Sequence, residues 1–141
     1  MTQPWKQVVE FFRERKWKVE VDEEKRMLQA GVEGDNGEWR FLVGVSEEGE
    51  FCIVLSYFPQ WCPQDRRRQC AELLTRINYG MALGGFQMEL ETGKVVYKTS
   101  YPFKEGNFEK DLFGDLLKQN IDVMDHFMPA IGGWCFREQR R

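Results

Sequence analysis

Residues 86–101 read FQMELETGKVVYKTSY and carry the clearest β-hairpin signal in the sequence, so the prediction of the fold starts from them. Apolar and polar side chains alternate over residues 86–91, which is the period of a strand with one buried face. Thr92 and Gly93 suit a tight turn, and residues 94–101 return with a strand-like pattern. The stretch therefore predicts two antiparallel strands.

Three more strands are expected upstream of this hairpin. Period-two alternation runs through residues 17–58 and is interrupted at 34–37 and 47–49, which contain residues that tolerate a positive φ. The last of the three strands, 51–58, is apolar on both faces, as is typical of a strand that is central or covered on both sides. Together with the hairpin, these segments predict a five-stranded antiparallel sheet.

Three helices are expected to pack against this sheet. Residues 4–16 and 63–80 each begin with a proline, and their apolar residues recur at helical spacing. A third helix is expected from Asn107, which can cap it, and is predicted to end or kink near Pro129. The predicted order is α-β-β-β-α-β-β-α, and the predicted fold class is α+β.

The length of 141 residues fits a single domain. Hydrophobic residues make up 42% of the chain, which is enough for a core, and no linker or internal repeat divides the sequence. We therefore expect one domain over residues 1–141, with an ordered core at about 4–131 and a C-terminal tail at 132–141.

The charge pattern narrows the classes of partner. The chain has 20 basic and 23 acidic residues, so it lacks the broad cationic field that nucleic-acid binding requires. No apolar run approaches the roughly 18 residues of a membrane helix, so membrane insertion is not expected. Charged residues are mixed with hydrophobic ones over residues 1–16, unlike in a secretory signal. The expected location is the cytoplasm.

The four cysteines, at positions 52, 62, 70 and 135, form no C-x-x-C pair, and the sequence has one histidine. This pattern favours four reduced thiols over a zinc set. Cys62 stands beside Pro63 at a predicted helix start, so it is the cysteine expected to be exposed, with a lowered pKa.

One group of side chains offers candidate enzyme chemistry. Asp122 precedes His126 by four residues, which places both on the same side of the third helix, and Asp125 is close by. A small enzyme or a metal-binding protein would use these three residues as a general base or as ligands. The interpretation we favour is an ordinary ion pair on the solvent face of the helix. No phosphate-binding glycine loop occurs, and no catalytic residue, metal or cofactor is expected.

Partner binding is the remaining class of function, and aromatic residues carry its signal. The chain has 5 Trp, 11 Phe and 4 Tyr, and helices on one face of a sheet would leave aromatic side chains exposed on the other. Trp61, Tyr101 and Trp134 are the candidate contact residues. The alternative is that every aromatic residue lies either in the core or at an incidental surface position.

Residues 74–86 (LTRINYGMALGGF) followed by 89–97 (ELETGKVVY) resemble the YbjN-like family of bacterial sensory transduction regulators. The shared pattern is a helix that ends in an asparagine, a short apolar step with glycine, and a strand that leads into a Glu-Thr-Gly turn. The resemblance covers nearly the whole chain.

The resemblance implies a fold similar to that of type III secretion chaperones. It also implies a non-enzymatic protein-binding or regulatory module that forms a homodimer and binds another protein. The family brings no catalytic or ligand residues to carry over.

Overall fold

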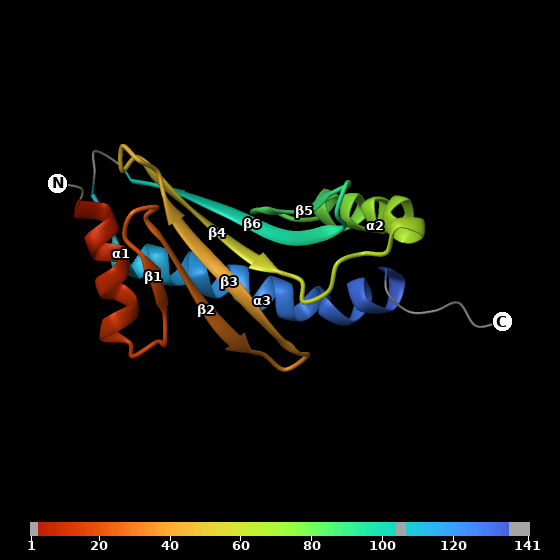
Figure 1. Ribbon diagram of the computed structural model, residues 1–141, viewed down its shortest axis with the longest axis horizontal. Coiled ribbons are helices and arrows are strands. Elements are labelled where there is room, and N and C mark those ends of the chain that lie inside the picture. Colours follow the sequence, from red (N-terminus) through yellow and green to blue (C-terminus); the bar gives the residue numbers. More distant parts are fainter. Residues whose placement is uncertain (1–2, 104–106, 136–141) are drawn as a thin grey trace.

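The computed structural model describes residues 3–103 and 107–135, in which helices pack on one side of an antiparallel sheet (Figure 1). The long helix α3 runs along the sheet, with α1 at one end of the molecule and α2 at the other. In chain order the elements are α1 (Gln3–Glu14), β1 (Glu20–Asp22), β2 (Met27–Glu33), β3 (Glu38–Val45), β4 (Phe51–Tyr57), the 3-10 turn η1 (Gln64–Arg66), α2 (Arg67–Tyr79), β5 (Gly85–Glu89), β6 (Lys94–Pro102) and α3 (Lys110–Cys135).

The sheet has six strands in the order β1-β2-β3-β4-β6-β5, and all neighbours are antiparallel. The expected number was five, and the additional strand is β1, which pairs with β2. Three residues are too few to display alternation. The turn at 23–26 also contains no glycine, proline or asparagine; Arg26 takes the left-handed conformation there, with a φ of 55°.

The helices agree with the expected order, with differences at their ends. Helix α1 ends at Glu14, and Lys16 follows with a left-handed φ of 62°. Helix α3 does not end near Pro129 but continues to Cys135. The first residues of the predicted tail are therefore helical, and residues 136–141 lie outside the described residues. Within the described residues, none of the helices combines the length and the apolar character needed to cross a bilayer.

Helix α3 continues past Pro129 because the loop between β2 and β3 supplies a replacement hydrogen bond. Pro129 has no N–H to donate to the carbonyl four residues earlier, which is that of Asp125. The side-chain amide of Asn36 donates to this oxygen at 3.0 Å. The Asp125 carboxylate in turn accepts from the backbone N–H groups of Asp35, at 3.1 Å, and Asn36, at 2.8 Å.

The buried side chains form two clusters beneath the helices. The first lies under α1 and the first part of α3 and includes Phe12, Phe41 and Phe113. The second lies under α2 and the last part of α3 and includes Leu74, Tyr97 and Met124. Both clusters use the same face of the sheet, because directly paired residues of antiparallel strands share a face.

A buried polar network joins α3 to the middle of the sheet. The indole of Trp39 donates to Ser56 Oγ at 3.1 Å, and this hydroxyl donates to Asn120 Oδ1 at 2.6 Å. The Asn120 amide donates to Thr99 Oγ1 at 3.0 Å and to the Val54 carbonyl at 3.2 Å. Because each buried partner here is satisfied, the network fixes how α3 sits along the strands.

Candidate functional site

The face of the sheet opposite the helices is the candidate site. Leu42 pairs with Leu55 on this face, and Tyr57 pairs with Val96, and none of the four belongs to either buried cluster. We call this surface the open face and define it by its seven half-exposed or exposed apolar side chains. They are Met27, Leu42, Phe51, Ile53, Leu55, Tyr57 and Val96.

The open face is apolar because β4 carries apolar residues on both of its sides. The sequence predicted a strand that is central or covered on both sides, and β4 is central, between β3 and β6. Its alternate residues Cys52, Val54 and Ser56 are buried under helices, whereas Ile53 and Leu55 are only partly covered by their neighbours in the sheet. An apolar surface left partly open in this way usually marks an interaction site.

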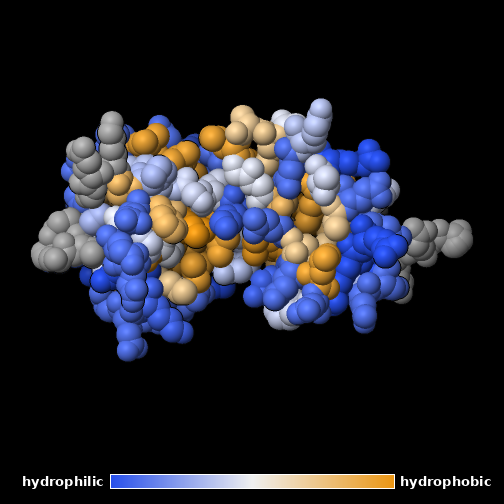
Figure 2. All heavy atoms as spheres, turned by 90° about the horizontal axis from the view of Figure 1, so that it is seen from above, coloured by the Kyte–Doolittle hydropathy of each residue, from blue (hydrophilic) through white to orange (hydrophobic). Residues whose placement is uncertain are grey.

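Charged side chains border the open face. Lys94 lies 5.9 Å from the ring centre of Tyr57 and 5.6 Å from that of Trp61. Arg40 forms an ion pair with Glu20 at 3.2 Å. In the view of Figure 2, hydrophobic residues gather along the middle of the molecule, and hydrophilic residues lie toward both ends. Such charges set the orientation of a partner more than its affinity.

One end of the open face is hollowed. The hollow has a volume of about 700 Å³, and Arg40, Tyr57 and Trp61 contribute to its wall. Gly31, which pairs with Arg40, also lines it and has no side chain to fill the space. The hollow is therefore a place where a side chain of a partner can be enclosed on an otherwise flat sheet.

The three predicted contact residues have different positions. Trp61 is 58% exposed and lines the hollow, and Trp134 is 54% exposed on α3, in the helix layer. Tyr101 is only 4% exposed, so the prediction that it lies on the surface as a contact residue is wrong. It pairs with Cys52 on the helix-covered face, and its hydroxyl accepts from the backbone N–H of Glu109 at 3.0 Å, just before α3 begins.

Sequence reasoning missed most of the open face. The aromatic residues Trp39, Phe41 and Phe86 are buried. Attention to aromatic residues alone, however, overlooked aliphatic side chains such as Ile53 and Leu55. The available signal was the second apolar stripe of β4, which had no predicted helix assigned to cover it.

The acidic and histidine side chains proposed for enzyme chemistry do not converge. Asp122 pairs with Lys118 at 2.7 Å, as expected of an ordinary helical ion pair, and this contact raises the pKa of Lys118. Asp122 and His126 do line one shallow surface hollow of about 350 Å³. Asp125, however, is engaged with the loop at 34–37 through Asp35 and Asn36. Its carboxylate holds the loop against α3 and is not directed at the histidine.

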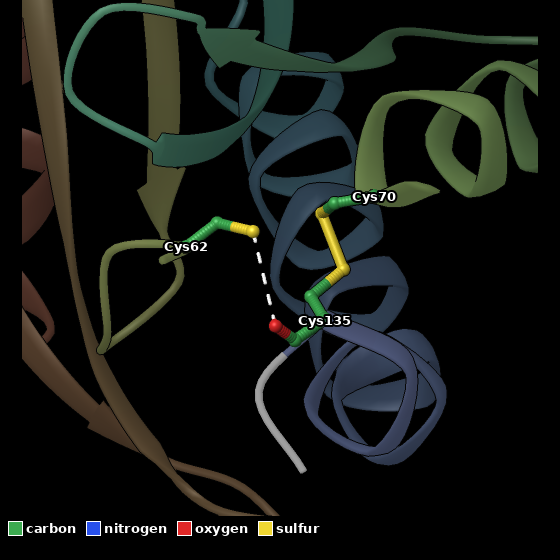
Figure 3. A group of neighbouring side chains, drawn as sticks. All are labelled: Cys62, Cys70 and Cys135. Carbon is green, nitrogen blue, oxygen red and sulfur yellow. Dashed lines mark hydrogen bonds between the residues drawn. A yellow bond between two sulfur atoms is a disulfide. The ribbon is translucent and has the colours of Figure 1, made fainter. Parts of the chain in front are cut away.

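The cysteines differ from the prediction of four reduced thiols. Cys70 in α2 and Cys135 at the end of α3 form a disulfide, which leaves Cys52 and Cys62 free (Figure 3). Cys62 is buried, and desolvation raises its pKa, so the expected exposed thiol with a lowered pKa is wrong. Burial raises the pKa of Cys52 to about 12. Sequence spacing could not reveal the disulfide, because 65 residues separate its cysteines.

Three of these cysteines form the one group among the described residues with spacing suitable for a metal ion. The sulfur atoms of Cys62, Cys70 and Cys135 all lie within 4.8 Å of one another. A cysteine binds a metal ion as its thiolate, and the disulfide leaves Cys62 as the one member of the trio able to form a thiolate. In the disulfide form, the trio therefore does not fit a metal site.

Comparison with known proteins agrees with this architecture. A sequence model of the family YbjN, described as "Putative bacterial sensory transduction regulator", matches residues 4–133. The crystal structure of YbjN from E. coli has a TM-score of 0.68 at 8% identity, with 92% of each chain covered. A chain of the ExsC-ExsE complex has a TM-score of 0.56 at 16% identity, with 90% of this chain and 92% of that chain covered. No curated protein matches the sequence. These likenesses confirm the expected α+β, secretion chaperone-like fold.

Proposed function

Because this chain belongs to the YbjN family, we propose that it is a non-enzymatic protein-binding or regulatory module that holds a segment of another protein on its open face. The observation that carries the proposal is the one-sided placement of the helices. Both buried clusters lie on a single face of the sheet, and the opposite face keeps seven apolar side chains partly exposed. A bound polypeptide would remove this surface from water.

A structure of similar fold supports this class of function. The chain with a TM-score of 0.56 comes from a complex of two proteins, ExsC and ExsE. Shared fold is a weak argument for shared function, so the argument for this chain depends on its own open face. The hollow beside Trp61 would enclose a large side chain of the partner, and Lys94 and Arg40 would face its polar groups.

The proposal includes a homodimer, by analogy with secretion chaperones, and a location in the cytoplasm. Light scattering tests the dimer, which would have twice the 16.8 kDa mass of one chain. A mass of one chain at micromolar concentration would contradict it.

Site-specific photo-crosslinking tests the open face directly. A benzophenone amino acid in place of Tyr57 would stand on the open face, whereas one in place of Tyr79, which is 95% exposed at the end of α2, serves as the matched control. We expect crosslinks from position 57 to a partner protein in bacterial cells, and few or none from position 79. Equal crosslinking at both positions would contradict binding on the open face.

Charge substitution provides a second, independent test. Leu55→Glu places a carboxylate in the middle of the open face, and Leu112→Glu does the same at an exposed leucine of α3. We expect at least tenfold weaker partner binding for Leu55→Glu, because binding would bury an unpaired charge, and unchanged binding for Leu112→Glu. Circular dichroism verifies that both variants are folded. Retained binding in Leu55→Glu would rule out the open face.

A further inference from the structure

Three cysteines from separate segments meet at one end of the molecule. Cys62 follows β4 in the loop before η1, Cys70 lies in α2, and Cys135 ends α3. All three are buried, and their sulfur atoms lie within 4.8 Å of one another. Figure 3 shows the Cys62 side chain pointing toward the Cys70–Cys135 disulfide, and its thiol donates to the Cys135 carbonyl at 3.8 Å. A free thiol therefore stands beside a disulfide.

The backbone of Cys62 is held from two sides. Its N–H donates to the Gly93 carbonyl at 2.8 Å, and its carbonyl accepts from Arg67 Nε at 2.9 Å. Gly93 has a left-handed φ of 84°, and a Cβ there would stand 2.1 Å from the Cys62 oxygen, so the β5–β6 turn packs directly on this residue. These contacts hold the backbone of Cys62 in place next to the disulfide.

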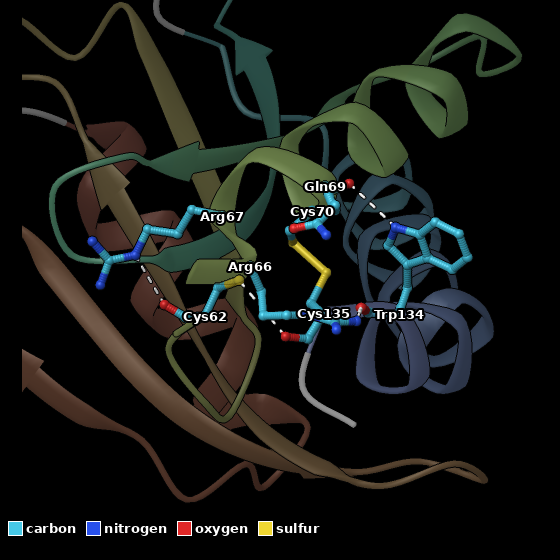
Figure 4. The surroundings of a disulfide bond; sticks show 7 residues. All are labelled: Cys62, Arg66, Arg67, Gln69, Cys70, Trp134 and Cys135. Atoms are coloured by element: carbon cyan, nitrogen blue, oxygen red, sulfur yellow. Dashed lines mark hydrogen bonds between the residues drawn. A yellow bond between two sulfur atoms is a disulfide. The ribbon is translucent and has the colours of Figure 1, made fainter. Parts of the chain in front are cut away.

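Two arginines offset part of the cost of forming a thiolate in this buried place. Desolvation raises the pKa of Cys62, the positive charges of Arg67 and Arg66 lower it, and Asp65 raises it slightly. The Nε of Arg66 is buried and has no hydrogen-bond partner in the described part of the chain, although the same guanidinium donates to the Trp134 carbonyl (Figure 4). A buried donor without an acceptor is rare, and the positive charge of this guanidinium favours the thiolate of Cys62.

We propose that Cys62, Cys70 and Cys135 form a thiol–disulfide exchange site, in which the crosslink moves among the three sulfur atoms. The thiolate of Cys62 attacks Cys70 or Cys135, and a new sulfur–sulfur bond forms as the Cys70–Cys135 bond breaks. The bonding electron pair leaves on the released sulfur, which takes up the proton that Cys62 gave away. No oxidant or reductant is consumed, because one disulfide and one thiol are present before and after.

The position of the crosslink decides which segments are joined. A Cys70–Cys135 bond joins α2 to the end of α3, whereas a Cys62–Cys70 bond joins α2 to the neighbouring loop and releases α3. The two exposed tryptophans of this region, Trp61 and Trp134, are adjacent in sequence to cysteines of the trio. Exchange would therefore alter the surface at this end of the molecule. The chemistry itself does not depend on the proposed protein binding.

Peptide mapping of the wild-type chain tests the exchange. The purified protein is incubated without added thiol at several pH values, quenched with acid, alkylated and digested. We expect the Cys70–Cys135 crosslink at neutral pH, and crosslinks that contain Cys62 to appear on raising the pH. Their rate of appearance should rise about tenfold per pH unit while Cys62 is mostly protonated. Finding only Cys70–Cys135 at every pH would overturn the proposal.

Serine variants provide a test that does not depend on the exchange rate. With oxidised glutathione as oxidant, Cys70→Ser should form a Cys62–Cys135 crosslink, and Cys135→Ser a Cys62–Cys70 crosslink. Cys52→Ser is the control, because Cys52 belongs to the other cluster and should enter no crosslink. Cys62 found as a free thiol or as a glutathione adduct in both folded variants would overturn the proposal. The wild-type mapping decides the matter if either variant fails to fold.

Discussion

The helix-covered face and the open face of the sheet are built from alternate residues of the same strands. On β4, Val54 is buried beneath the helices, while its neighbour Leu55 is only half-buried on the other side. Both are apolar, so side-chain type does not distinguish the two faces. What differs is the second layer: in the part of the chain that the structure describes, α1, α2 and α3 all pack on one face, and no helix covers the other. We expect the covered face to contribute most of the stability, and the proposed function uses the open face.

A pair of leucine substitutions, one on each face, should reveal the largest difference in stability between the two faces. Leu28 of β2 is fully buried on the covered face, whereas Leu42 of β3 lies on the open face. Leu28→Ala should lower the free energy of unfolding by about 3–5 kcal/mol, because it removes packed methyl groups and leaves a cavity. Leu42→Ala should cost about 1 kcal/mol or less. Urea unfolding measures both, and similar losses would mean that the open face is also part of the core.

The polar network between the two buried clusters should contribute the next largest effect. Asn120→Leu keeps the size of the side chain but leaves the hydroxyls of Ser56 and Thr99 without their partner in the interior. We expect a loss of about 2–3 kcal/mol in unfolding free energy. Gln119→Leu is the neighbouring control, since the Gln119 amide makes one hydrogen bond, to the Tyr97 hydroxyl, and should cost about 1 kcal/mol. Equal losses would show that the network has no special role.

The pH dependence of stability at alkaline pH tests how well the covered face buries Cys52, whose thiol lies there. Burial raises its pKa from 9.0 to about 12, so above pH 9 the unfolded chain loses a proton that the folded chain keeps. Stability from this group is complete below about pH 9 and declines as the pH rises towards 12, by about 1.4 kcal/mol per pH unit.

The measurement is urea unfolding of the wild type and of Cys52→Ala between about pH 8 and 10.5. Cys52→Ala also removes a packed sulfur at all pH values, so the comparison is of slopes and not of absolute stabilities. We expect the variant to have the shallower decline. Parallel curves would show that the thiol ionises as readily in the folded chain as in the unfolded one.

The smallest expected effect concerns the loop that supports α3 at Pro129. Asn36→Ala removes the hydrogen bond to the Asp125 carbonyl and should cost about 1 kcal/mol. Pro129→Ala restores a backbone N–H that can donate to the same carbonyl, so Asn36→Ala should cost less in that background. A double-mutant cycle measures the coupling. An unchanged cost would show that the two residues act independently.

The fold could be predicted where the sequence signals for an element lie within a few residues of one another. Strands β2 to β6 follow from alternation and turn residues, and α2 from its periodicity and Gly80, because these signals lie within a few residues of one another. Strand β1 escaped prediction because it has only three residues and because the turn after it, at 23–26, contains no glycine, proline or asparagine. The passage of α3 beyond Pro129 depends on Asn36, which lies 89 residues from Asp125 and gives no local sign of the contact.

The candidate site could be predicted only in part. Trp61 was correctly placed on the surface, although its role in binding stays a prediction, and Tyr101 was wrongly placed there. Both are aromatic residues in apolar surroundings, and only the register of β6 against β4 decides that Tyr101 faces the helices. Arg67, at the start of α2, is also more than a solvent-facing charge. Its guanidinium donates to four backbone carbonyls, those of residues 62, 90, 91 and 92.

The sequence by itself determined the order of the helices, the hairpin and its neighbouring strands, and an apolar pattern on both sides of β4, because each of these depends on side chains a few residues apart. Only the tertiary structure decided that the described helices cover the same face, that Asp125 holds the loop at 34–37 against α3, and that three cysteines meet. Those outcomes depend on packing between distant segments, whose free energy no local pattern contains.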